Sequence, residues 1–151
     1  MPDADPPRST VDRVRHVLTR LAADVDLWVA TASADGQPYL VPLSFLWRDG
    51  RLVMVTAERS VTVRNLRHSG QVRLALDGTR DVVLIEGDVA IAAAGEIDPD
   101  VADAYAAHAG WDPRTDGANT WLVVTPTSVR SWREANELAG REVMRDGVWL
   151  A

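Results

Sequence analysis

Asp-Gly pairs recur between short apolar runs of this chain, and they constrain its fold more than any other feature. The runs DLWVATAS, QPYLVPLSFLW and RLVMVTA are separated by Asp35-Gly36 and Asp49-Gly50. Asp-Gly favours the tight two-residue turn that joins neighbouring antiparallel strands. We therefore expect three consecutive strands in a meander between residues 26 and 57.

The second half of the chain continues the strand pattern. The runs QVRLALD and DVVLIEGDVAIAAA meet at Asp77-Gly78, and Glu86-Gly87 inside the second run predicts a bulge or a sharp bend. The run TWLVVTPTSVRSWR predicts a strand that is interrupted, or lies at a sheet edge, at Pro126. The last run, REVMRDGVWL, predicts a hairpin about Asp146-Gly147, or one short strand and a tail.

Three segments have helical patterns. The first, STVDRVRHVLTRLAAD, begins with Ser9 as N-cap and carries apolar residues at helical spacing. These apolar residues are Val11, Val14, Val17, Leu18 and Leu21. Residues 60–69 predict a short helix, and Asp98 with Pro99 marks the start of a third helix that ends near residue 109.

About six strands joined mainly by turns favour a mainly β fold, an antiparallel barrel with peripheral helices. A doubly wound parallel sheet is disfavoured because its strands require helical crossovers. A length of 151 residues indicates one domain. We expect it to span residues 9–151, after a disordered, proline-rich lead-in over residues 1–8.

Composition excludes several kinds of chemistry. The chain has no cysteine, which rules out disulfides, thiolate catalysis and Cys-ligated zinc. It also has no lysine, so any phosphate must be held by arginine, hydroxyl groups or backbone N–H groups. His16, His68 and His108 form no metal-binding pattern, and the common nucleotide and hydrolase motifs do not occur.

Charge and hydropathy restrict the partners. The formal net charge of -6 argues against non-specific nucleic-acid binding. No apolar run approaches the roughly 20 residues that span a bilayer, and the N-terminus lacks the apolar region of a signal peptide. We expect a cytoplasmic protein with neither membrane nor nucleic-acid partners.

The segment ERSVTVRNLRHSG, residues 58–70, is unusually basic for an acidic protein. Between residues 59 and 76 the chain has no acid and four arginines: Arg59, Arg64, Arg67 and Arg73. Ser60 can cap the helix just after a strand that ends at Thr56, and a capped helix N-terminus beside arginines binds anions. The alternative is a solvated face of a short helix, which composition alone favours.

Tryptophan is frequent, with six among nine aromatic residues. Four lie in predicted strands: Trp28, Trp47, Trp121 and Trp132. Core packing or an interface between subunits explains most of them. Contact with a flat aromatic ligand is the alternative.

The order of these elements over residues 29–91 resembles the pyridoxamine 5'-phosphate oxidase-like family of FMN-binding split β-barrel proteins. The resemblance lies in A-T-x-x-x-D-G-x-P, the strand V-P-L-S-F-L-W, the hairpin D-G-R-L, S-x-x-x-R-N-L-R before a strand, and the strand containing I-E-G. Members of the family are homodimers that hold their flavin at the seam between subunits.

The resemblance implies a set of cofactor-binding residues. The isoalloxazine edge would lie along Val41, Pro42, Leu43 and Ser44, and the phosphate near Thr56, Ser60, Thr62 and Arg64. Trp132 would approach the ring from the partner chain. FMN-binding relatives usually have a basic pair after the position of Ser60, where this chain has Val61-Thr62, and Arg59 and Arg64 are the candidates to replace that pair.

The resemblance implies an oxidoreductase that uses FMN, or the deazaflavin coenzyme F-420, on a small-molecule substrate. The second strand carries Tyr39 and Ser44 where pyridoxamine phosphate oxidases proper have basic residues, which argues against that activity itself. An alternative is a non-catalytic split-barrel dimer that binds or senses a flavin, haem or another flat ligand. A third is a dimer whose site has decayed and holds no cofactor.

Overall fold

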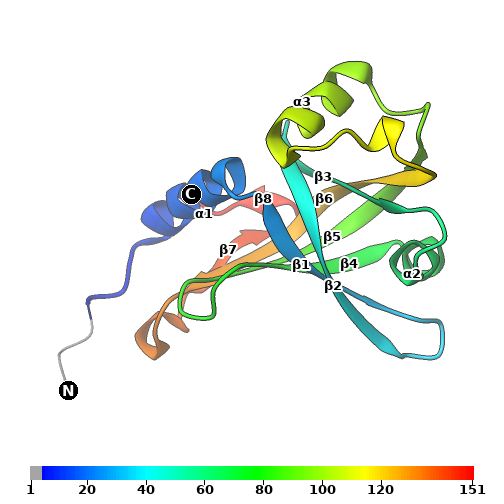
Figure 1. Cartoon of the computed structure of the whole chain (residues 1–151). Coiled ribbons are helices and arrows are strands. Elements are labelled where there is room, and N and C mark those ends of the chain that lie inside the picture. The colour runs from blue at the N-terminus through cyan, green and yellow to red at the C-terminus, as the bar shows by residue number, and fades with distance from the viewer. Residues whose placement is uncertain (1–4) are drawn as a thin grey trace.

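The computed structural model describes residues 5–151 and is built around an antiparallel β-barrel (Figure 1). The barrel strands are β1 (Asp26–Ala32), β2 (Pro38–Arg48), β3 (Arg51–Ala57), β4 (Gln71–Leu76), β5 (Val82–Ala93) and β6 (Asn119–Trp132). Their order is β3-β2-β1-β4-β5-β6, and β3 also pairs with β6, which closes the ring. The strands β7 (Glu142–Arg145) and β8 (Val148–Trp149) continue the sheet beyond β6. The predicted mainly β barrel is confirmed.

The helices lie at the periphery: α1 (Thr10–Ala23), α2 (Val61–Ser69) and α3 (Pro99–Ala109). Ser9 and Asp98 are the N-caps of α1 and α3, and each side chain accepts a bond from a backbone N–H of the first turn. Among the apolar residues at helical spacing in α1, Val14, Val17 and Leu21 are buried, whereas Val11 is 52% exposed and Arg13 is buried instead. In the part of the chain that the structure describes, no helix has the length and apolarity to cross a membrane.

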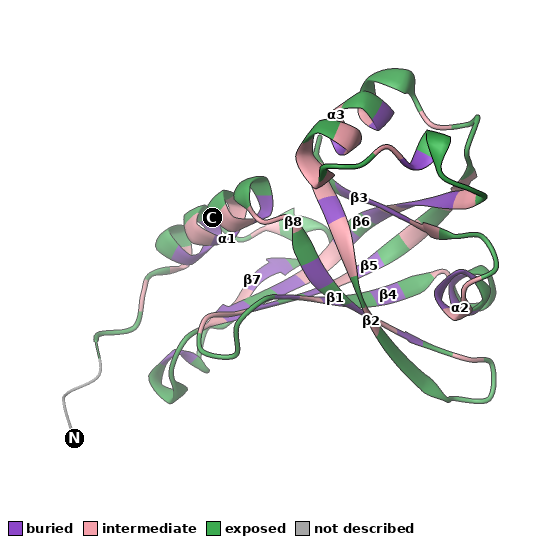
Figure 2. Ribbon diagram, viewed as in Figure 1, coloured by how far each residue is buried: buried purple, intermediate pink, exposed green. Residues whose placement is uncertain are grey.

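Two apolar clusters make up the core. The larger fills the barrel and is closed at one end by Val14, Val17 and Leu21 of α1. The smaller lies beneath α3, where Tyr105 packs edge-to-face on Trp121 with ring centroids 5.3 Å apart. Figure 2 shows the buried stretches concentrated on the barrel strands, while the outer sides of the helices are exposed.

The strand β3 pairs on both of its edges, and its two ladders cover different parts of its length. Phe45–Arg48 of β2 pair with Arg51–Met54 of β3, and the residues from Leu52 to Ala57 of β3 pair with β6. The first part of β2, from Pro38 to Ser44, pairs only with β1 among the described residues. The barrel is therefore split between β2 and β3, and α2, which follows β3, packs against β1 and β3.

A register irregularity between β5 and β6 falls where the sequence predicts a bulge or bend. The register between β5 and β6 shifts at Glu86/Gly87. Of the two alternatives predicted for Pro126, an interruption is wrong, because β6 is continuous and pairs with β5 on both sides of this residue, whereas a local edge position is confirmed. Its pairing with β3 ends at Val124 and its pairing with β7 begins at Val129, so Pro126 sits where no strand on that side needs an N–H donor.

A buried ionic cluster fixes α1 and the start of the chain to the end of the sheet. The Arg8 guanidinium forms a bidentate ion pair with the Glu137 carboxylate, with N···O distances of 2.8 and 3.0 Å. The buried Arg13 donates to the carbonyls of Ser131, Glu137 and Gly140. The hydrogen bonds from Arg8 lower the pKa of Glu137 to about 2.

The predicted disordered lead-in lies partly outside the described residues, which begin at Asp5. Within the described part, residues 5–8 have no regular secondary structure. The Asn136 amide donates to the Asp5 carbonyl at 2.8 Å, and Arg8 reaches Glu137 as above.

Replacing Gly87 by alanine is expected to destabilise the barrel. A Cβ at Gly87 would lie 2.6 Å from Val124 Cγ1 and 2.8 Å from the Thr125 carbonyl oxygen, so the backbone of β6 must shift. We expect a loss of about 1–3 kcal/mol in the free energy of unfolding, measured with urea. Gly95→Ala is the control because a Cβ there meets no atom within 4 Å. Equal stability of the two variants would contradict the close approach at the bulge.

The stabilisation from Glu137 is expected to depend on pH. Its pKa is about 2 in the folded protein against an ordinary value of 4.5, so its contribution is complete above the ordinary value and disappears as the pH falls towards 2. At neutral pH, Glu137→Gln should reduce the free energy of unfolding by roughly 3 kcal/mol. Urea titrations at pH 7 and pH 3 test this expectation, because the difference between wild type and variant should shrink at the lower pH. A difference that stays constant would show that the carboxylate charge is not responsible.

Candidate functional site

The start of α2 presents backbone and hydroxyl groups at the split in the barrel. Ser60 is the N-cap, and its Oγ accepts from the Val63 N–H at 3.2 Å. The N–H groups of Val61 and Thr62 belong to the first turn, where a helix supplies no internal acceptor. Thr56 lies half-buried near the end of β3, just before this corner. The arrangement is a helix N-terminus of the kind that binds anions.

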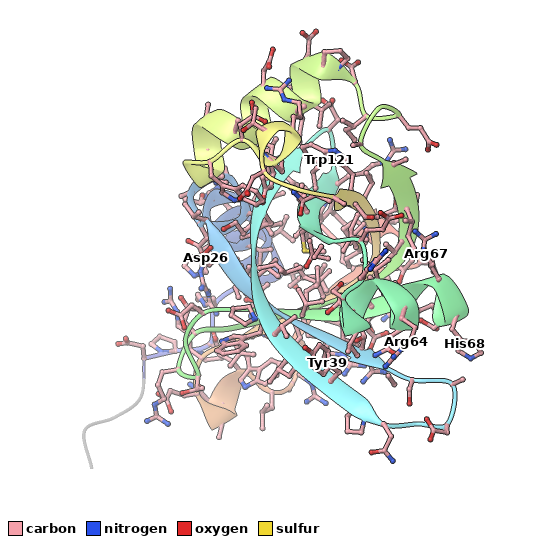
Figure 3. All side chains as sticks on the ribbon, turned by 45° about the vertical axis from the view of Figure 1, so that its right-hand side comes forward. Asp26, Tyr39, Arg64, Arg67, His68 and Trp121 are labelled. Carbon is pink, nitrogen blue, oxygen red and sulfur yellow. The ribbon has the colours of Figure 1, made fainter. Side chains whose placement is uncertain are left out.

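Positive charge surrounds this corner. Arg59, Arg64 and Arg67 are exposed, and within residues 5–151 no carboxylate forms an ion pair with any of them. Figure 3 shows Arg64, Arg67 and His68 projecting from α2 in different directions. Arg67 and His68 follow Arg64 by three and four residues, which is the spacing of helical neighbours. Exposed arginines that form no ion pair remain available to an anion.

The Thr62 side chain does not contribute to this exposed surface. It is only 2% exposed, on the buried side of α2. On the same side, the amide of the buried Asn65 donates to Thr31 Oγ1 of β1 at 3.0 Å. This bond ties α2 to β1 and so positions the corner, to which Thr62 offers only its N–H group.

The predicted ring-edge residues of β2 divide between two faces, because side chains alternate along a strand. Val41 and Leu43 pack against the barrel core, while Pro42 and Ser44 lie on the outer face. The bond from the Phe45 N–H to the Val25 carbonyl sets the alternation of hydrogen bonds with β1. Pro42 consequently occupies a position whose nitrogen points away from β1, where its missing N–H breaks no ladder bond.

The outer face of the sheet carries an apolar row that no helix or strand of the chain covers fully. Strand register places Pro42 beside Trp28, Trp28 beside Ala75, and Ala75 beside Leu84. Trp28 is 43% exposed.

The next row on this face consists of Leu40, Ala30, Arg73 and Glu86, in which Arg73 forms an ion pair with Glu86 at 3.2 Å. An exposed apolar row bounded by charge is typical of an interaction surface.

A groove of about 390 Å³ opens on the same face. None of the residues predicted to bind the cofactor lines it. Its lining includes Ala30, Ala32, Gln71, Arg73, Glu86 and Asp88. The sequence did not reveal this groove, because these residues come from three strands and only the register brings them together.

Trp132 lies far from the basic corner within one chain. Thr120, near the start of β6, pairs with Thr56, whereas Trp132 is the last residue of β6 and pairs with Val82. At about 3.3 Å per residue, the two positions lie roughly 40 Å apart along the strand. If Trp132 contributes to a site at the α2 corner, it must come from a second copy of the chain.

Two histidines have hydrogen-bonding partners within the fold. His16 Nε2 lies 2.7 Å from Asp81 Oδ2, and His108 Nε2 lies 2.9 Å from the Asp24 carbonyl. Burial raises the pKa of Tyr105 to about 12, so its phenol stays protonated at neutral pH. None of these groups lies on α2 or β2.

Comparisons with known proteins agree with the geometry. The sequence model of the family described as pyridoxamine 5'-phosphate oxidase matches residues 16–133. No curated protein sequence matches the chain.

Solved structures with a similar fold share little sequence with the chain. An F420 reductase has a TM-score of 0.61 at 18% identity over 74% of this chain and 93% of its own. A pyridoxamine 5'-phosphate oxidase-related, FMN-binding protein from Nostoc punctiforme has 0.54 at 17% over 82% and 80%. A heme-binding protein from Mycobacterium smegmatis has 0.65 at 16% over 95% and 60%. At these identities the likeness establishes the fold alone.

Proposed function

This chain belongs to the pyridoxamine 5'-phosphate oxidase family, and on that premise we propose that it is an oxidoreductase that binds a flavin-type cofactor, FMN or a deazaflavin, between two copies of itself. The observation that carries the proposal is the α2 corner, where a capped helix start lies among arginines without acidic partners. The names of the FMN-binding protein and the F420 reductase with this fold point to the same class of cofactor.

The groups at the corner suit the phosphate of such a cofactor. Ser60 can still donate its hydroxyl proton, the first N–H groups of α2 have no internal acceptor, and Arg59 and Arg64 supply charge. Together these groups stand in for the basic pair that Val61-Thr62 replaces. The Thr62 side chain is not part of this proposal because it is buried.

The outer face supports the second part of the proposal, the homodimer. Its apolar row from Pro42 to Leu84 passes beside β2, whose outer residues we propose for the ring. A second copy packed on this face would exclude water from the site and could bring its own Trp132 close. A bound flavin would accept and return hydride, while the protein supplies orientation and a dry environment.

Cofactor binding is the direct test of this proposal. The purified chain is titrated with FMN and, separately, with coenzyme F-420, and binding is followed by quenching of tryptophan fluorescence. Micromolar affinity for one of them supports the proposal, and no binding of either at high micromolar concentrations contradicts it. Turnover with a reduced nicotinamide or deazaflavin donor then tests whether the complex is an enzyme.

A non-catalytic binding protein is the second candidate. The observation that favours it is the replacement of the usual basic pair by Val61-Thr62, with Thr62 buried. The fold is also that of a protein described as heme-binding. This candidate predicts tight binding of flavin or haem and no turnover of any reduced donor.

Removing the corner's charge is expected to weaken FMN binding selectively. The double variant Arg59→Ala/Arg64→Ala should bind FMN about a hundred- to ten-thousandfold more weakly, because each charge-assisted contact is worth about 1.5–3 kcal/mol and two are lost. Riboflavin lacks the phosphate, so its affinity should change little. Arg51→Ala removes another exposed arginine, from the β2–β3 hairpin, and serves as the control. Unchanged FMN affinity in the double variant would place the phosphate elsewhere.

A charge in the apolar row is expected to dissociate the dimer. Trp28→Glu puts a carboxylate at the centre of the row, and this position is already 43% exposed within one chain, so the fold should persist. Sedimentation should show a dimer for wild type and a monomer for the variant, with FMN affinity lost together with the dimer. Val11→Glu, on the exposed side of α1, is the control. A dimeric Trp28→Glu variant would show that this face is not the seam.

A further inference from the structure

Ser44 and Asp26 form a cross-strand pair next to the apolar row. They are register partners on β2 and β1, and the Ser44 hydroxyl lies 2.7 Å from Asp26 Oδ1. The neighbouring register pair on this face is Pro42 with Trp28. Ser44 also closes the stretch of β2 that pairs with β1 alone.

The direction of the Ser44–Asp26 hydrogen bond is fixed, with Ser44 as the donor. An ionised carboxylate only accepts hydrogen bonds, so the single hydroxyl proton of Ser44 must point to Asp26. The lone pairs that remain on Ser44 Oγ can then only accept. Asp26 forms no ion pair within the described residues, and Ser44 is its sole side-chain partner there. The nearby arginine, Arg20, is held by Asp24 and by the carbonyls of Asp77 and Asp81.

We infer that Asp26 is a positioning residue that makes Ser44 a hydrogen-bond acceptor for an N–H group of the bound ring. The inference rests on the proposed function, because Ser44 is among the residues proposed for the ring edge. It also names the chemistry that this position selects. A ring system with an imide N–H, as in flavins and deazaflavins, satisfies the acceptor, whereas a ligand that offers only carbonyl or ring-nitrogen acceptors would meet unfavourable lone pairs.

The test uses riboflavin, which carries the ring but no phosphate, with the full-length chain. Asp26→Asn releases the polarity of Ser44, because an amide can either donate or accept, and riboflavin binding should weaken about three- to tenfold. Ser44→Ala should cause a similar loss, and the double variant should bind no more weakly than Ser44→Ala alone. With 3-methylriboflavin, which lacks the imide N–H, Asp26→Asn should leave the affinity unchanged.

A redox measurement separates this role from a purely structural one. Asp26→Asn removes a negative charge beside the ring and should make the midpoint potential of bound FMN more positive. Asp49→Asn is the matched control, since it removes one negative charge in the β2–β3 turn, where asparagine tolerates the positive φ of 52°. Thermal melting of each apo variant verifies that the fold persists.

The outcomes distinguish the two proposals. If wild type binds FMN and riboflavin but Asp26→Asn alters neither affinity nor potential, the inference is wrong and the proposed function stands. A loss on Asp26→Asn that persists in the Ser44→Ala background would also overturn the inference, because Asp26 would then act without Ser44. If wild type binds neither compound, the inference fails, and the proposed function fails with it when coenzyme F-420 does not bind either.

Discussion

The pairing of β3 on both of its edges is the constraint on which the rest of this structure depends. On one edge β3 pairs with β2 over four positions, and on the other it pairs with β6 from Leu52 to Ala57, which closes the ring of six strands. The ladder between β2 and β3 ends at Phe45 and Met54, so the first part of β2 pairs with β1 alone. The split and the exposed stretch of β2 follow from the point at which this ladder ends.

The candidate site has a polar, basic part at α2 and an apolar part on the sheet. The α2 corner collects backbone N–H groups, a hydroxyl and arginines in a protein that is acidic as a whole. The adjoining sheet face carries the apolar row centred on Trp28. A cofactor with an anionic tail and a flat ring needs a basic environment for the tail and an apolar one for the ring. The Asn65–Thr31 bond contributes by holding the corner against β1.

Much of the fold could be predicted because its signals are local. Asp49-Gly50 fixes a turn without reference to the rest of the chain, and Glu86-Gly87 marks a bulge because a side chain at Gly87 would collide with β6. Local patterns were not sufficient at Val11 and Pro126. Val11 shares the helical spacing of Val14 and Val17 but is exposed, and Pro126 is tolerated because of where two other strands end.

The same distinction between local and tertiary determinants applies to the candidate site. By itself the sequence determined the succession of strands along the chain, the capped helix after β3 and the arginines near it, since each depends on residues close together in the chain. Only the tertiary structure decided that Thr62 is buried, that Pro42 and Ser44 face outward while Val41 and Leu43 face the core, and that Asp26 meets Ser44. Strand register, which is set by the closure of the whole barrel, is the physical reason, because it brings together side chains that no local pattern connects.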